Sequence, residues 1–157
     1  MRLKAGQYSQ LDRYDIAILN LLSQEGRLPV TDLARRIGLS KTPAQARLRR
    51  LQTEGYITGF RAVLNPAKLG HDHVAFVELK LTDTTERALS AFNDAVQRMP
   101  EVEECHMIAG AFDYLLKVRT TDIKAYRQVL GEKISALPYV GSSSTHVSME
   151  AVKDIGY

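Results

Sequence analysis

The spacing of apolar residues changes partway along the sequence, and this change constrains the fold most. Up to about residue 55, apolar residues recur at helical spacing in short segments that end at glycines. From residue 74 they alternate with polar residues, as in a strand with one buried face. Residues 65–72 contain Pro66 and Gly70 and are typical of a linker. We therefore predict two domains, residues 1–64 and 73–157.

The first domain is predicted to hold three short helices. They cover residues 12–25, 32–37 and about 41–54. Asp12 suits the first turn of the first helix, and Thr31 is the expected cap of the second. Gly38 ends the second helix and provides a turn into the third. Three short helices with this turn predict a helix-turn-helix, followed by an extended segment over 56–64.

The third predicted helix has two opposed faces. Ala44, Leu48 and Leu51 fall at i, i+4 and i+7 and form a narrow apolar stripe. The opposite side is small and polar and is edged by cations. Ser40 caps this helix, or Thr42 caps it with Pro43 as its first residue and Gln45 closing a capping box.

Such an outer face suits the major groove of DNA. The predicted DNA-binding residues are Lys41, Thr42, Gln45, Ala46, Arg47, Arg49 and Arg50. We expect Thr42, Gln45 and Arg49 to read bases. Lys41, Arg47 and Arg50 are expected to contact phosphates, with an internal ion pair as the alternative for Arg47. The distribution of charge also favours DNA binding by the first domain. Residues 1–61 hold 11 Lys and Arg against 5 Asp and Glu, whereas residues 62–157 hold 10 Lys and Arg against 13 Asp and Glu.

The second domain is predicted to alternate strands and helices as β-α-β-β-α-β. Strands are expected over 74–81, 102–109, 113–120 and 142–152, and helices over 86–99 and 122–137. This order is the ferredoxin-like pattern, so the fold class is α+β. Right-handed crossovers place both helices on one face of the sheet. Ile123 and four later apolar residues of the second helix are expected to point inward.

The other face of that sheet is predicted to be bare. Val74, Phe76 and Leu115 are expected to point there, and large apolar groups on a bare face call for a cover. The simplest cover is a second copy related by a two-fold axis. Such a homodimer would present two recognition helices to half-sites about one helical turn apart.

Several other chemistries are disfavoured by the sequence. A single cysteine, Cys105, excludes an internal disulfide and is expected to be a core thiol in a reducing cytoplasm. His71, Asp72 and His73 lack a fourth metal ligand, and no metal site is predicted. Glu103 and Glu104 are expected on opposite faces of a strand, so they form no catalytic pair. No P-loop, dinucleotide fingerprint or nucleophile elbow appears, and no apolar run approaches the ~18 residues of a membrane span.

Short motifs in register along most of the chain resemble the Lrp/AsnC (feast/famine) transcription regulators. In the first half they are Leu11-Asp12-Arg13-Tyr14-Asp15, Ile18-Leu19, Gly26-Arg27, Leu33-Ala34, Gly38-Leu39-Ser40, Arg47-Leu48-Arg49-Arg50-Leu51 and Gly55-Tyr56-Ile57. In the second half they are Glu103-Glu104-Cys105-His106, Gly110-Ala111-Phe112-Asp113-Tyr114-Leu115-Leu116, Leu137-Pro138 and Met149-Glu150-Ala151-Val152-Lys153. The resemblance implies a winged-type helix-turn-helix and an effector-sensing domain. It also implies dimers that assemble further, often to octamers, and that bind an amino acid between dimers.

The resemblance places effector-binding residues at Met107, Gly110, Ala111, Phe112, Asp113, Ile123, His146, Val147 and Ser148. Many relatives carry an acidic residue at the position of Ala111, and an aromatic residue is common at the position of His146. The turn at Gly110 also has its own chemistry, because exposed backbone N–H groups can hold a carboxylate. Asp113 can accept the ammonium group of the same amino acid.

The function predicted from these features is regulation of transcription in response to a small amino acid. Within the family the chain looks most like the subgroup that activates proline-dehydrogenase genes, so proline is the first expected effector and no cofactor is expected. One alternative is a global, nucleoid-associated regulator that responds to leucine or only weakly to any ligand. An alternative of another class is a small ferredoxin-like enzyme or non-catalytic binding module tethered by a helix-turn-helix. The absent catalytic constellation disfavours an enzyme, and a cytoplasmic location is expected.

Overall fold

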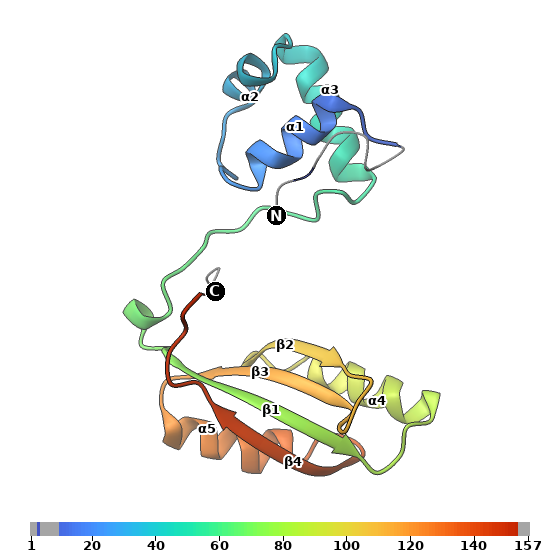
Figure 1. The fold of residues 1–157 in the computed structure, drawn as a ribbon, viewed down its shortest axis with the longest axis vertical. Coiled ribbons are helices and arrows are strands. Elements are labelled where there is room, and N and C mark those ends of the chain that lie inside the picture. The colour runs from blue at the N-terminus through green and yellow to red at the C-terminus, as the bar shows by residue number, and fades with distance from the viewer. Residues whose placement is uncertain (1–2, 4–9, 154–157) are drawn as a thin grey trace. The chain divides into compact units, whose positions relative to one another are not determined.

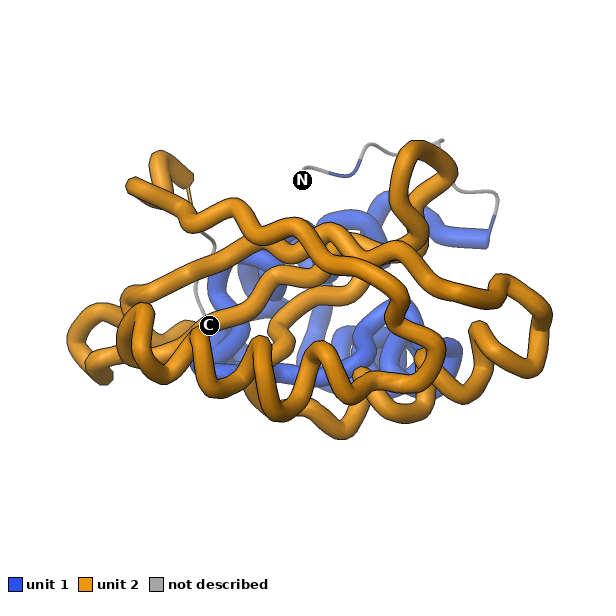
Figure 2. Tube along the Cα trace, turned by 90° about the horizontal axis from the view of Figure 1, so that it is seen from below, with its two compact units in different colours: residues 1–62 blue, residues 63–157 orange. Residues whose placement is uncertain are grey.

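A computed structural model describes residue 3 and residues 10–153, and it divides the chain into two compact units. Figure 2 colours these units, residues 1–62 and 63–157. In the described residues, the first contains three helices, and the second contains a four-stranded sheet with helices on one of its faces (Figure 1). The predicted α+β class, a helix-turn-helix followed by a ferredoxin-like domain, is confirmed.

The helices of the first unit pack around a small apolar core. They are α1 (Arg13–Leu22), α2 (Val30–Ile37) and α3 (Lys41–Thr53). The buried residues of this core are Leu11, Ile16, Ile18, Leu22, Leu33, Leu48 and Leu51. A capping box starts α1, because Asp12 Oδ1 accepts from the N–H groups of Tyr14 and Asp15, and Asp15 Oδ2 accepts from that of Asp12. Helix α1 is shorter than predicted and ends three residues before residue 25.

The starts of α2 and α3 differ from the predicted caps. Helix α2 begins at Val30 after Pro29, so Thr31 lies inside the helix and caps nothing. Ser40 occupies the N-cap position of α3, which was one of the two predicted caps, but its side chain makes no capping hydrogen bond. Pro43 is the third residue of α3, which excludes the capping box predicted on Thr42. The position is tolerated because the first N–H groups of a helix have no intrahelical acceptor.

Gly38 forms the turn between α2 and α3 in a left-handed conformation, with φ of 73°. A side chain there would meet no atom within 4 Å, so conformation alone opposes substitution. We expect Gly38→Ala to lower the free energy of unfolding by ~1–2 kcal/mol, the cost of placing an L-residue in this region. Urea denaturation measures the change. Gly59→Ala is the matched control, since that site is equally open and lacks the positive φ. Equal losses in both variants would contradict the assignment.

Residues 58–65 adopt no regular structure, so the extended segment predicted over 56–64 forms no strand in the structure. The region predicted as a linker contains one short 3-10 helix, Ala67–Leu69, which ends at Gly70 with φ of 72°. His71 and Asp72 then lead into the sheet.

The sheet of the second unit has the order β2-β3-β1-β4, with neighbouring strands antiparallel. Its strands are β1 (His73–Leu81), β2 (Val102–Met107), β3 (Tyr114–Thr120) and β4 (Val140–Val147). Helices α4 (Glu86–Val96) and α5 (Ile123–Val129) lie on the same face of the sheet (Figures 1 and 2). This arrangement is the one that right-handed crossovers dictate.

The core of this unit lies between the two helices and the sheet. Alternate residues of β1 supply the sheet side, and Ala75, Val77 and Leu79 are fully buried. Phe92 of α4 packs on Tyr114 of β3 with ring centroids 4.3 Å apart. The other buried residues are Leu81, Val96, Leu116, Val118, Tyr126, Val129, Ile134 and Leu137. Cys105 is half-buried against this core, and burial raises the pKa of its thiol.

Two predicted elements of the second unit differ in the structure. The helix expected over 122–137 is α5 followed by a π-helical segment, Leu130–Ile134, in which the N–H of Ser135 donates to the carbonyl of Leu130. Ile123, predicted to point inward, is 51% exposed. The last strand ends at Val147, and Met149 beyond it is fully exposed.

The prediction that Glu103 and Glu104 point to opposite faces is wrong. The pairing of β2 with β3 shifts register between Val102 and Glu104, which places one extra residue in β2. Lys117 Nζ therefore lies 3.2 Å from Glu103 Oε2 and 3.6 Å from Glu104 Oε1. Arg119 also pairs with Glu103, so both carboxylates take part in ion pairs across the sheet.

Candidate DNA interface and effector site

Helix α3 has the two faces that its sequence predicts. Ala44, Leu48 and Leu51 face the core of the unit and are 0%, 9% and 0% exposed. Thr42, Ala46 and Arg49 are exposed on the opposite side, and Gln45 is half-buried beside them. The outer face therefore combines short side chains with one long cation, and it is free to approach a partner.

The cations of this unit fall into two groups. Among the described residues, four arginines pair with carboxylates, and they are Arg35, Arg36, Arg47 and Arg50. Lys41 and Arg49 have no carboxylate partner in the described part of the chain. These two side chains of α3 are therefore available to an external anion or to a base edge.

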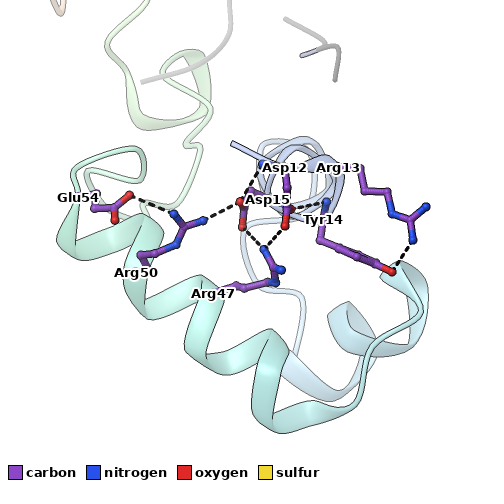
Figure 3. Close-up of polar contacts among 7 residues, drawn as sticks. All are labelled: Asp12, Arg13, Tyr14, Asp15, Arg47, Arg50 and Glu54. Carbon is purple, nitrogen blue, oxygen red and sulfur yellow. Dashed lines mark hydrogen bonds and ion pairs between the residues drawn. The ribbon is translucent and has the colours of Figure 1, made fainter. Parts of the chain in front are cut away.

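A buried carboxylate on α1 holds the two paired arginines of α3 (Figure 3). The Asp15 side chain is 1% exposed. Arg47 Nη1 lies 2.9 Å from its Oδ1, and Arg50 Nη2 lies 2.6 Å from its Oδ2. Asp12 adds a contact of 2.7 Å to Arg47, and Glu54 lies 3.6 Å from Arg50. The hydrogen bond and charge of Asp15 raise the pKa of Arg50.

These contacts change how two predicted phosphate contacts are understood. For Arg47, the internal ion pair that was the alternative prediction is confirmed. For Arg50 no internal partner was predicted, yet its guanidinium already has two carboxylates. The sequence pattern missed Asp15 because its partners lie 32 and 35 residues further along the chain.

An open groove of about 550 Å³ runs along this flank of α3. Residues of α3 form one side, and the start of α1 forms the other. Its lining residues are Gln10, Asp12, Asp15, Pro43, Ala46, Arg47 and Arg50. Ala46 belongs to both the groove and the outer face, so the paired arginines border the surface predicted to read DNA.

The predicted effector loop joins β2 to β3. The N–H of Ile108 donates to the carbonyl of Asp113 at 2.8 Å and closes the loop. Within the described residues, the N–H groups of Gly110, Ala111 and Phe112 donate to no protein acceptor. Gly110 and Ala111 are exposed, so these donors are open to an anion.

Asp113 is anchored to the neighbouring strand. Its Oδ2 accepts from the N–H of Leu81 at 2.7 Å, and its own N–H donates to the carbonyl of Leu79 at 2.9 Å. The other carboxylate oxygen has no partner among the residues described. Asp113 is thus a structural acceptor for β1 with one oxygen left for a ligand.

The predicted effector residues do not come together in one chain. The loop and Met107 lie where β1 ends, beside Leu79 and Leu81. The remaining residues lie where β1 begins, because Val147 pairs with Ala75 and Ser148 donates to the carbonyl of Val74. The second group is Ile123, His146, Val147 and Ser148. Leu81 lies six positions after Ala75 in β1, a distance of about 20 Å along the strand.

The face of the sheet that carries no helix presents an apolar centre with a charged border. Phe76 lies opposite Lys117 on β3 and His146 on β4, and it is 37% exposed. Leu115 is half-buried two residues from Lys117. His146 Nε2 lies 3.3 Å from Glu78 Oε1. Val74, predicted on this face, is 7% exposed. We call this surface, centred on Phe76 and Leu115, the helix-free face.

The described residues contain no cluster of three or more side chains arranged to hold a metal ion. His73, part of the histidine pair in the sequence, directs Nδ1 to the hydroxyl of Thr120 at 2.9 Å, and its ring lies tilted beside that of Tyr126 with centroids 5.6 Å apart. None of the described helices has the length and apolar character needed to span a membrane.

Comparison with known proteins identifies both units. Residues 11–58 match the winged helix-turn-helix DNA-binding family, and residues 74–156 match the Lrp/AsnC ligand binding domain. A proline dehydrogenase transcriptional activator from Rhizobium radiobacter is 65% identical over 93% of this chain and 94% of its own length. The leucine-responsive regulatory protein of Escherichia coli K12 is 46% identical over 91% of this chain and 87% of its own.

A solved structure has the same fold. The transcriptional regulator from Neisseria meningitidis in complex with L-Met superposes with a TM-score of 0.85 at 28% identity, and the match covers 92% of this chain and 94% of that one. The relatives are regulators of transcription and not enzymes. Because its ligand-binding half and its DNA-binding half both match, the chain belongs to the Lrp/AsnC family of transcription regulators.

Proposed function

We propose that this protein regulates proline catabolism by binding DNA and responding to proline. The observation that carries the proposal is the 65% identity, along nearly the whole of both chains, to a proline dehydrogenase transcriptional activator. The effector loop supports an amino acid ligand, since it offers backbone donors and a carboxylate at one turn. A regulator of chromosomal genes works in the cytoplasm, at the nucleoid.

The DNA-reading surface in this proposal is the outer face of α3. Thr42, Gln45 and Arg49 contact bases, with Ala46 allowing close approach. Lys41 contacts a phosphate at the start of the helix. Exposure of this face and the absence of a described carboxylate partner for Lys41 and Arg49 support these roles.

The effector in this proposal is held by the loop at Gly110. The N–H groups of Gly110, Ala111 and Phe112 receive the carboxylate, and the oxygen of Asp113 not bonded to Leu81 receives the secondary ammonium of proline. Because Ile123 and His146 to Ser148 lie at the opposite end of the sheet, a second copy supplies that half of the site. The same separation supports assembly beyond a dimer.

The experiment that tests this function begins with thermal unfolding of the purified protein in the presence of each of the twenty amino acids. We expect proline to raise the melting temperature most, because a ligand that binds only the folded state stabilises it. DNA binding is then measured with and without proline, on duplexes selected from a random library by the protein. A protein that proline neither stabilises nor shifts on DNA would reject the proline assignment.

Asp113→Asn is expected to lower affinity for proline by about tenfold or more while leaving the fold intact. The amide oxygen still accepts from Leu81, but the charge that attracts the ammonium is lost. Isothermal titration calorimetry measures the affinity, and thermal unfolding without ligand checks the fold. Glu104→Gln, which removes an exposed carboxylate elsewhere in the unit, is the matched control. An Asp113→Asn protein with full proline affinity would contradict the site.

A leucine-responsive, global regulator is the second candidate. It is favoured by the 46% identity to the leucine-responsive regulatory protein of Escherichia coli. The same amino acid panel separates the two, because stabilisation by leucine and not by proline would select this candidate. No response to any amino acid, together with DNA binding that extends over long duplexes, would indicate a compacting role.

A further inference from the structure

Two guanidinium groups of α3 pair with two carboxylates at the start of α1 and with a third, Glu54, at the end of α3 itself. We name Asp12, Asp15, Arg47, Arg50 and Glu54 the Asp15 cluster (Figure 3). Two cations face three anions, so the cluster as a whole carries a formal charge of −1. A DNA backbone approaching this flank of α3 therefore meets cations that are already neutralised.

The cluster lies at the edge of the surface proposed to read bases. Arg50 is one helical turn from Ala46, and both line the same groove. Arg47 and Arg50 remain 29% and 39% exposed, so their guanidinium groups are within reach of solvent. The carboxylates, above all the buried Asp15, hold both groups on the protein, and the centroid of the Tyr14 ring lies 5.3 Å from Cζ of Arg47.

We propose that Asp15 is a specificity-determining residue, which withholds Arg47 and Arg50 from DNA phosphates. The inference rests on the proposed DNA-reading face of α3. Phosphate contacts strengthen binding to every sequence alike, whereas base contacts discriminate between sequences. By keeping two arginines on the protein, Asp15 suppresses binding to arbitrary DNA and leaves discrimination to the outer face.

The geometry favours this role over the opposite one, in which Asp15 would present the arginines to phosphates. A presenting carboxylate leaves a net positive surface, but here Asp12 and Glu54 add further negative charge to both arginines. The bonds to Asp15 also use one Nη of each guanidinium group, Nη1 of Arg47 and Nη2 of Arg50, and a phosphate would have to compete with Asp15 for these donors.

The test compares the wild-type protein with Asp15→Asn, an isosteric change that removes the charge. Binding to a random-sequence duplex and to a duplex selected by the wild type is measured by fluorescence anisotropy across a salt series. We expect Asp15→Asn to bind the random duplex about tenfold more tightly at low salt. Each released arginine steepens the slope of log K against log salt by about 0.9, so the total change is about one to two. The ratio of the affinity for the selected duplex to the affinity for the random duplex is expected to fall.

Further variants show where the gain comes from. Asp15→Asn combined with Arg50→Ala should return the slope toward the wild-type value. Glu54→Gln, at a half-exposed site, removes one of the two carboxylates that pair with Arg50 and should change the salt slope in the same direction by less. This variant provides the test if Asp15→Asn unfolds the unit. Asp94→Asn on α4 is the control for net charge and should change neither slope nor ratio.

Folded Asp15→Asn protein that binds both duplexes more weakly, or with an unchanged slope, would overturn the inference. If Asp15→Asn unfolds, an unchanged slope in Glu54→Gln would overturn it instead. These outcomes differ from failure of the proposed function, in which the wild type itself would not distinguish a selected duplex from a random one.

Discussion

In a homodimer joined through the helix-free face, replacing Phe76 with glutamate is expected to separate the two copies and to lower affinity for DNA with two half-sites by about 10²–10⁴-fold. Phe76 is the apolar centre of the helix-free face, and it is 37% exposed in a single chain. In a dimer formed through this face the substitution would bury a charge against apolar groups of the second copy. Two linked recognition helices would then become two independent, weaker ones.

The same substitution is compatible with the folded monomer. The new carboxylate would lie beside Lys117 and His146, which face Phe76 across β3 and β4. Loss of association therefore need not involve loss of fold. Sedimentation equilibrium measures the mass, and thermal unfolding checks the structure.

Gln97→Glu adds the same charge at an exposed site directly after α4, on the side of the sheet that the helices cover. This control should remain associated. If the wild type is associated and Phe76→Glu keeps its mass, a different surface joins the copies, and a wild type that is itself a monomer would reject the dimer.

The elements that the sequence predicted well are those with a strong local period. The alternation of β1 and the narrow stripe of α3 were read correctly because each reflects one buried face. The order of strands and helices then determines the sheet topology through the handedness of crossovers. The π-helical segment after α5 was missed because a switch from i+4 to i+5 bonding leaves the apolar spacing almost unchanged.

The contacts that the sequence could not predict are those between distant positions. Asp15 lies in the first turn of α1, where acids are common, and nothing local indicates that two arginines of α3 reach it. The bulge at Glu103 depends on the register of β2 against β3. The predicted effector residues were grouped by resemblance, and the structure places them near the two ends of β1, so they do not lie together in one chain.

Arg49→Ala is expected to lower the preference for a selected duplex over a random one by about 5- to 150-fold. This range corresponds to the ~1–3 kcal/mol of discrimination that one bidentate base contact supplies. Arg49 is exposed on the outer face of α3, and in the described residues no carboxylate competes for it. A guanine contact is the pairing that its planar donors favour.

Lys41→Ala provides the comparison, since Lys41 also has no carboxylate partner among the residues described and lies at the start of α3, where we propose a phosphate contact. It should weaken binding to both duplexes alike and reduce the salt slope by about one. Competition binding with both duplexes at fixed salt separates the two effects. If Arg49→Ala weakened binding to every sequence equally, Arg49 would be a phosphate contact, and the reading of bases would fall to Thr42 and Gln45.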